Sequence, residues 1–325
     1  MSNIKLSICI PTYNFGEFIG EAIESIVEQI GNEVEIVVGD GASTDNTEEI
    51  INRYQLRFPN IKYHKFEKKG GIDLDLIKTI RLAKGDYCWM LSSDDVLRPG
   101  SIKRILDEIE LGYSIYLCNR TKCDRNLKEI SSQYWLSNED KDCIFDFSDN
   151  TVLLRYLKSA QSLGALFSYM SSIIVRRAEW DNMSSSEILI GSNYAHVYKL
   201  FSLAKNGGKV MYIRDSLVAT RLFNDSFMAN GIARRYLIDL YGYQNLANHL
   251  FLENSIRDAF KSVLRREHKW YCLVGLASKV TVKEWNELVI MFSSFGYHPA
   301  VLSLVASLGR LKRLMAFVRY FRNLL

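Results

Sequence analysis

The sequence predicts an α/β fold, in which a sheet carries helices on both faces and is followed by a helical carboxyl-terminal extension. Up to about residue 120, short apolar runs rich in β-branched residues alternate with segments of helical periodicity. Polar clusters follow three of these runs, and from about residue 230 onward the pattern is wholly helical. Strand–helix alternation of this kind is typical of parallel strands covered by helices on both faces.

The first part of the chain is expected to contain five strands and four helices, each bounded by turn or capping residues. The predicted strands span residues 5–11, 33–38, 61–66, 87–91 and 114–118. Three of the predicted helices span residues 16–30, 73–83 and 99–109. The fourth begins after a cap at Ser43 or Thr44 and ends near residue 57. Pro99 suits the start of the helix over 99–109, because its missing N–H has no partner to lose there.

The pattern weakens after this point. Strands are expected at residues 170–176 and 209–213, with a helix over 191–205 between them. We find no internal repeat and no low-complexity linker. The organisation predicted is a domain over residues 1–228 and a helical extension over residues 229–325.

Composition excludes several classes of protein. The chain has 325 residues, of which 48% are hydrophobic and 24% charged, as in ordinary folded proteins. A net charge of +4 is too small to indicate nucleic acid as a partner. The sequence has no signal-peptide pattern, no apolar run of about 18 residues and no zinc-type cysteine spacing. Cys9, Cys88 and Cys118 lie in apolar runs, which suggests buried thiols and a cytoplasmic protein.

Three polar clusters follow predicted strands. Thr12–Asn14 follow the first strand, Asp40–Asp45 the second and Ser92–Asp95 the fourth. Carboxyl ends of parallel strands meet at one edge of a sheet, where ligands of such folds bind. The clusters therefore predict a single site.

The residue types indicate a nucleotide diphosphate ligand. Two adjacent carboxylates, Asp94 and Asp95, can hold Mg²⁺ or Mn²⁺ against a diphosphate. Asp40 can accept a hydrogen bond from a base N–H, and Tyr13 offers an aromatic face. A solvated turn with a helix cap is the alternative for either acidic cluster, but three clusters on one edge argue against it. Gly70-Gly71 lets backbone approach a ligand, although such a pair alone is simply a loop.

The segments SICIPTYN, VVGDGASTDNT and AKGDYCWMLSSDD, with Pro99 after them, resemble the family 2 glycosyltransferases of the GT-A fold over roughly residues 4–225. More narrowly, GDYCWMLSSDD with SIYLCNR resembles the abequosyltransferases of O-antigen (lipopolysaccharide) assembly. The resemblance implies a Rossmann-like mixed sheet and a metal-dependent, hexosyltransferase-type enzyme. Its donor would be a nucleotide sugar such as a CDP-3,6-dideoxyhexose, and its acceptor a lipid-linked oligosaccharide.

The resemblance also implies residue roles. The metal ligands would be Asp94 and Asp95. The donor would be bound by Pro11, Thr12, Tyr13, Asn14, Asp40, Ser43, Gly71, Ser93, Asp94 and Arg221. Two departures stand out: Ser92 replaces the aspartate that often contacts the ribose, and residues 73–76 (DLDL) replace an Arg-Asn pair. Diphosphate contact then falls to Lys78, Arg221 or the metal.

The catalytic base is the largest departure. Counting back from Gly207, the family's acidic base corresponds to His196. A neutral imidazole can take a hydroxyl proton near neutral pH. The alternatives are a satisfied helix histidine, or one that binds acceptor without moving a proton. Glu187 and Asp181 are the reserve candidates.

The tail over residues 309–325 (GRLKRLMAFVRYFRNLL) has five basic residues and no acidic one. One helical face would be formed by Leu311, Leu314, Met315, Val318, Phe321 and Leu325. Such a helix can lie on an anionic membrane surface, which predicts a peripheral protein at the inner face of the cell membrane. The alternative is a helix that packs against the rest of the protein or a second subunit.

Two other functions compete with sugar transfer. A non-catalytic nucleotide-sugar-binding module would explain Ser92 and the missing acidic base, but not the retention of Asp40, Asp94 and Asp95. A dinucleotide-dependent oxidoreductase would need a GxGxxG segment after the first strand, and the sequence there is PTYNFG.

Overall fold

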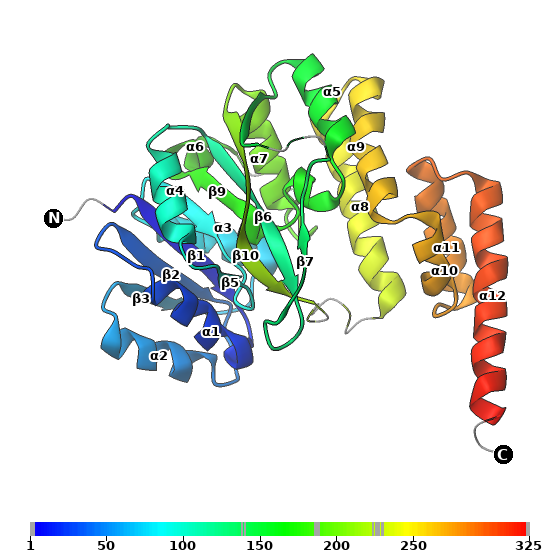
Figure 1. Ribbon diagram of the computed structural model, residues 1–325, viewed down its shortest axis with the longest axis horizontal. Helices are drawn as coiled ribbons and strands as arrows, with labels where there is room; N and C mark the ends of the chain where they lie inside the picture. Colours follow the sequence, from blue (N-terminus) through cyan, green and yellow to red (C-terminus); the bar gives the residue numbers. More distant parts are fainter. Residues whose placement is uncertain are drawn as a thin grey trace. The chain divides into compact units, whose positions relative to one another are not determined.

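A computed structural model describes residues 4–137, 139, 141–184, 189–222, 224, 228 and 231–322, with side chains to residue 316. The chain divides into two compact units, Met1–Asn224 and Asp225–Leu325 (Figure 1). The first unit is α/β and the second is helical.

The first unit is built around a single mixed sheet. Its strands are β1 (Leu6–Thr12), β2 (Val34–Asp40), β3 (Ile61–Lys65), β4 (Tyr87–Met90), β5 (Val96–Leu97), β6 (Ile115–Cys123), β7 (Glu129–Gln133), β8 (Cys143–Asp146), β9 (Ile173–Arg176) and β10 (Lys209–Arg221). Its helices are α1 (Gly16–Val27), α2 (Thr47–Arg57), α3 (Gly71–Arg81), α4 (Ser101–Ile109), α5 (Asn150–Ser159), α6 (Arg177–Asn182) and α7 (Ala195–Lys205), with 3₁₀ turns η1 (Leu163–Leu166) and η2 (Met170–Ser172).

The strand order is β3-β2-β1-β4-β9-β6-β10-β5, with β7 beside β6 and β8 beside β10. β1 is parallel to β2 and β4, and β2 is parallel to β3. The alternation pattern alone suggested parallel strands throughout, but β9 is antiparallel to both β4 and β6. The reason is local: η2 precedes β9 directly and lies by the carboxyl end of β4, so β9 starts from that edge and runs the opposite way.

Several predicted boundaries were wrong. α2 starts at Thr47, so neither Ser43 nor Thr44 caps it. The carboxylate of Asp45 instead accepts the N–H of Thr47, at 3.1 Å. α7 starts at Ala195 rather than 191, because the backbone before it turns through positive φ at Gly191 (90°) and Asn193 (70°). β10 runs to residue 221 rather than 213, because its register shifts between residues 213 and 218 let it keep pairing with β6.

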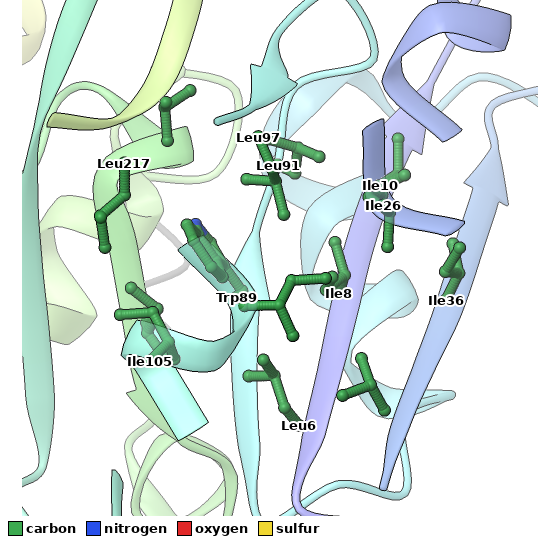
Figure 2. Close-up of a cluster of buried hydrophobic side chains, with 14 of the residues drawn as sticks. Leu6, Ile8, Ile10, Ile26, Ile36, Trp89, Leu91, Leu97, Ile105 and Leu217 are labelled. Carbon is green, nitrogen blue, oxygen red and sulfur yellow. The ribbon is translucent and has the colours of Figure 1, made fainter. Parts of the chain in front are cut away.

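The core of the first unit joins one face of the sheet to two helices. Figure 2 shows Leu6, Ile8 and Ile10 of β1 beside Ile36 and Trp89, with Ile26 of α1 and Ile105 of α4 packed near them. All seven are fully buried. The next residues along the strands, such as Cys9 and Val37, are also fully buried on the other face, because successive side chains of a strand point to opposite sides. The predicted burial of Cys9, Cys88 and Cys118 is confirmed.

The second unit consists of α8 (Ile232–Leu250), α9 (Asn254–Glu267), α10 (Trp270–Ala277), α11 (Val282–Ser294) and α12 (Pro299–Arg322). Thr281 and Glu284 form a capping box at the start of α11. α10 and α12 approach closely at Gly309, where an added Cβ would lie 2.7 Å from the Cβ of Ala277. No described helix is long and apolar enough to cross a membrane.

A buried carboxylate organises the amino ends of the central strands. Glu35 is 2% exposed and accepts hydrogen bonds from the Ser7 hydroxyl at 2.7 Å and the Lys84 N–H at 2.6 Å, while Lys62 forms an ion pair with it. Burial alone would raise the pKa of Glu35, but the hydrogen bonds from Lys62, Ser7 and Lys84 outweigh it and lower the pKa below its usual value. The ionised carboxylate therefore stabilises the folded state at neutral pH.

Glu35→Gln should lower the free energy of unfolding by about 1–3 kcal/mol near neutral pH, because charged hydrogen bonds are lost. A carboxyl whose folded pKa is depressed contributes stability above its unfolded pKa and loses it as pH falls through the folded pKa. The difference between variant and wild type should therefore vanish in acid. Urea unfolding followed by tryptophan fluorescence at both pH values measures this, with the exposed Glu49→Gln as control. An equal penalty at both pH values would contradict the account.

Candidate active site

The loops after β1 and β2 are tied together at the carboxyl edge of the sheet. The N–H of Asn14 donates to the Ser43 hydroxyl, and the N–H of Thr44 donates to the Asn14 side chain, both at 2.8 Å. The N–H of Gly41 donates to the carbonyl of Thr12 at 2.9 Å. Asn14 (φ 56°) and Ala42 (φ 65°) hold left-handed backbone, a strain that is common where loops form sites. Two of the three predicted clusters therefore form one structure.

Asp40 lies at the end of β2 with no exposed surface. One carboxylate oxygen accepts the N–H of Ser43 at 2.8 Å, and the other accepts the hydroxyl of Tyr63 at 2.7 Å. Burial and the Asp40 charge raise the pKa of Tyr63 well above its usual value. Asp40 thus orders the loop that follows it, and its contact with a base stays a prediction.

The other predicted donor residues of this region lie close by in the sequence and fold. Pro11 is buried within β1, and Gly71 begins α3 with φ 77°. Tyr13 is half-buried, and the Lys69 ammonium lies 3.7 Å from the centroid of its ring. The hydroxyl of Thr12 is buried and has no hydrogen-bond partner among the described residues. A buried orphan hydroxyl at the end of a strand suits contact with a ligand.

Asp95 is the buried member of the acidic pair, with 2% of its surface exposed. Its carboxylate accepts hydroxyls from Tyr169 and Ser171, both at 2.6 Å, and Thr220 also hydrogen-bonds to it. Burial and then the charge of Asp94 raise its pKa to about 7. Asp95 therefore anchors the loop after β4 to η2 and β10.

Asp94 is only partly buried, whereas its neighbour Ser93 is 3% exposed. The Asp94 carboxylate accepts the Ser92 hydroxyl on one oxygen and the Asn224 amide, at 2.8 Å, on the other. The buried Asp95 fixes the backbone of this loop, and the carboxylate of Asp94 remains partly accessible beside it.

Arg221 is 6% exposed, and its guanidinium is already engaged within the protein. It forms an ion pair with Glu21 and donates to the carbonyls of Arg125, at 3.1 Å, and Asp94. It also lies 5.1 Å from the centroid of the Phe18 ring. Arg221 joins α1 to the backbone of the acidic loop, so its predicted contact with donor phosphates stays a prediction.

The acidic loop fits a divalent cation of the kind that a substrate helps to hold. In the described residues no three His, Cys, Asp or Glu side chains are grouped as a complete metal site. Mg²⁺ is commonly held by one or two carboxylates, with phosphates and water as the other ligands. The accessible Asp94, with the buried negative potential of Asp95 beside it, matches that donor set, and a cation would relieve the repulsion between the two carboxylates.

His196 lies in α7 with 4% of its surface exposed. Its Nε2 is 3.1 Å from the carbonyl of Phe167, a residue with φ 60°, and its Nδ1 is buried without a partner among the described residues. Burial lowers the pKa of His196 below its usual value, so the ring is neutral near pH 7. The buried ring, held at Nε2 by the Phe167 carbonyl, resembles a helix histidine with a structural role, and the base role stays a prediction.

Asp73 of α3 lies at the start of α7. Its carboxylate accepts the N–H groups of Gly191, Asn193 and Ala195, at 2.8, 2.9 and 3.1 Å. A carboxylate at a helix amino terminus satisfies free N–H groups and complements the helix dipole. Of the reserve bases, Glu187 lies outside the described residues, and Asp181 pairs with Arg177 at 3.5 Å.

The sequence did not reveal the residues that complete the acidic corner. Tyr169, Ser171 and Thr220 come from weakly patterned segments, and nothing local marks their hydroxyls as partners of Asp95. Arg120 belongs to the same corner, with its guanidinium 4.2 Å from the Tyr169 ring centroid and 5.3 Å from that of Trp135. The sequence pointed to Arg120 in one way only, because it is the last residue of the SIYLCNR segment on which the family resemblance rests.

Comparison with known proteins places this geometry in context. The model of the family "Glycosyl transferase family 2" matches residues 7–195. The abequosyltransferase RfbV of Salmonella typhimurium is 34% identical over 98% of this chain and 97% of its own length. The glycosyltransferase GlyG of Streptococcus pneumoniae is 22% identical over 69% of this chain and 72% of its own.

Solved structures of similar fold are also glycosyltransferases of the GT-A type. Residues 1–349 of S. aureus TarS, in complex with UDP-GlcNAc, give a TM-score of 0.64 at 18% identity, covering 90% of this chain and 80% of that one. The Pyrobaculum calidifontis mannosyltransferase PcManGT, in complex with GDP-Man and Mn²⁺, gives 0.57 at 14% identity, covering 96% and 87%. The expected GT-A fold is confirmed. With a family model over more than half of its length, this chain belongs to glycosyl transferase family 2.

Proposed function

We propose that this family 2 glycosyltransferase moves a 3,6-dideoxyhexose such as abequose from its CDP-linked donor onto a lipid-linked oligosaccharide in O-antigen or other surface-polysaccharide synthesis. The observation that carries sugar transfer is the accessible Asp94 carboxylate, fixed on the buried Asp95 beside the joined β1 and β2 loops. The 34% identity with an abequosyltransferase along nearly the whole of both chains supports the choice of sugar.

The chain's own residues would divide the work in the following way. The Tyr13 ring and the orphan hydroxyl of Thr12 would bind the nucleoside, while Asp40 keeps their loop in place. Asp94 would hold a divalent cation, which neutralises charge on the departing diphosphate. The Mn²⁺ in the PcManGT complex and the UDP-GlcNAc in the TarS complex are features of those proteins that support this division.

A nucleotide-sugar-binding module without catalysis is the second candidate. Two observations favour it: the Ser92 hydroxyl donates its hydrogen bond to Asp94, and the imidazole of His196 is buried. The two candidates separate in an assay of nucleotide release from a panel of nucleotide sugars, with and without a membrane extract as acceptor. We expect CDP release from a CDP-sugar only when the extract is present. Tight donor binding without acceptor-dependent release would favour the module.

Metal removal tests the role of Asp94. EDTA should abolish transfer and added Mn²⁺ or Mg²⁺ should restore it. Asp94→Asn should lower turnover about 10²–10³-fold, the usual loss when one preorganised electrostatic contact is removed. Asp107→Asn on the exposed face of α4 is the control. Full activity of metal-stripped wild-type enzyme would refute the assignment.

His196 is tested by a readout that separates a base from a positioning residue. The burial of its ring supports positioning, so His196→Asn should lower the melting temperature while the pH profile of kcat keeps its shape. Loss of a general base would instead cost about 10²–10⁴ in rate and remove the acidic limb of the profile. That second result would support His196 as the base. Glu187→Gln, made in parallel, reports on the reserve candidate.

The membrane proposal concerns α12. Leu311, Leu314 and Met315 are 51%, 59% and 48% exposed, and basic residues lie between them. The Arg313 guanidinium donates hydrogen bonds to the carbonyls of Ser278 and Val280, so it is less available to lipid headgroups. We infer that the exposed face rests on anionic lipid at the inner face of the cell membrane.

Replacing Leu311 and Leu314 together by Ser should weaken binding to phosphatidylglycerol-containing vesicles by about tenfold or more, since two apolar anchors are lost. Co-sedimentation measures the bound fraction. Leu56→Ser, a substitution at an 89% exposed leucine of the first unit, is the control. Equal binding by wild type and the double variant would show that this face of α12 does not bind the lipid surface.

A further inference from the structure

Asp75 is a buried carboxylate that binds backbone N–H groups of Gly70 and Gly71 and has no part in the transfer as proposed above. It lies in α3, one turn after Gly71, and is 4% exposed. Both of its oxygens accept the N–H of Gly70, at 3.1 and 3.2 Å. Within the described ranges no lysine or arginine nitrogen is paired with it, and burial raises its pKa above the usual value. A buried carboxylate with spare acceptor positions gains stability when a donor reaches it.

The carboxylate is placed against the nucleotide loops. A Cβ added to Gly41 would lie 2.7 Å from Oδ2 of Asp75 and 3.5 Å from the carbonyl of Thr12. A Cβ added to Gly70 would lie 2.5 Å from its Oδ1. Glycine at both positions therefore allows Asp75 to sit between the loop after β2 and the loop before α3.

The neighbouring groups suit a flat ligand with hydrogen-bonding edges. The carbonyl of Thr12 accepts the N–H of Gly41, the residue against which Asp75 packs, and the buried hydroxyl of Thr12 has no partner among the described residues. Tyr13 follows it with a half-buried ring, and Lys69 lies over that ring just before Gly70. An aromatic face, an orphan hydroxyl and an under-used carboxylate thus converge at the ends of β1, β2 and β3.

Asp73, on the same helix, shows what a purely structural carboxylate looks like here. Its two oxygens accept three N–H groups at the start of α7. Asp75 accepts N–H groups from Gly70 and Gly71, so its two oxygens have one N–H partner fewer than those of Asp73.

We propose that Asp75 is a specificity-determining residue that reads the base of the donor, accepting a hydrogen bond from the exocyclic amine of cytosine. An ionised carboxylate can only accept hydrogen bonds. Cytosine presents an N4 amine as donor, whereas uracil presents the O4 acceptor at the same position, and Asp or Glu is the usual partner of the cytosine amine. The O4 of uracil would face a carboxylate oxygen of Asp75. Both atoms are acceptors, so no hydrogen bond can form between them and their lone pairs repel. The inference rests on the proposed function, because it assigns a residue to that same donor site.

The test is calorimetric titration of CDP and UDP, each with Mg²⁺, into wild type, Asp75→Asn and a control, Asp86→Asn. Asp86 is an exposed carboxylate before β4, away from these loops. Wild type should bind CDP at least about tenfold more tightly than UDP, the discrimination typical of one base contact. In Asp75→Asn the amide can donate to O4, so the CDP-to-UDP affinity ratio should fall about tenfold or more. Asp86→Asn should keep the wild-type ratio.

The outcomes separate this inference from the function it rests on. Equal affinity of wild type for both nucleotides, or an unchanged ratio in Asp75→Asn, overturns the role of Asp75 and leaves nucleotide binding standing. Failure of wild type to bind either nucleotide overturns both. Asn keeps an oxygen for the Gly70 N–H, which favours folding; if melting curves show otherwise, Asp75→Ser takes its place, with a ratio expected to approach one.

Discussion

The burial of the Asp95 carboxylate at the carboxyl end of β4 is the constraint on which the rest of the site depends. A buried carboxylate is tolerated only when hydrogen bonds replace its lost water. Here the donors are hydroxyls of Tyr169, Ser171 and Thr220, which lie far from Asp95 in the sequence. Meeting this requirement fixes η2 and the end of β10 at one corner. Asp94, the next residue, is then held in a defined position while its carboxylate remains partly accessible.

The same requirement explains the mixed sheet. Ser171 belongs to η2, and β9 begins two residues later, so β9 must leave the carboxyl edge and run antiparallel to β4 and β6. Arg221 completes the corner at the end of the long strand β10, where it binds the backbone of Asp94 and pairs with Glu21 of α1. Long-range polar contacts thus position the acidic loop, while the apolar core shown in Figure 2 supports the strands beneath it.

The sequence was sufficient for those features that local patterns encode. Apolar periodicity placed β1 to β4 and α1 to α3 within a few residues. The loops that carry the first two polar clusters are joined, as the Asn14–Ser43 bond shows, while the ligand site predicted there stays a prediction. The sequence was not sufficient where long-range contacts decide. The antiparallel β9, the extension of β10 and the engagement of Arg221 depend on partners more than 50 residues away, as Ser171 does for the loop after β4. His196 was placed on its helix, but its burial against Phe167 could not be predicted from spacing.

The central claim is that loops after β1, β2 and β4, with the start of α3, form a single donor site. Amide hydrogen exchange with and without CDP and Mn²⁺ tests it most directly, because bound ligand slows exchange in the segments it contacts or orders. The account predicts joint protection of residues 11–14, 40–45, 69–75 and 92–95, with no change in α8 to α11 of the second unit. Protection confined to one of these loops, or located in the second unit, would contradict it.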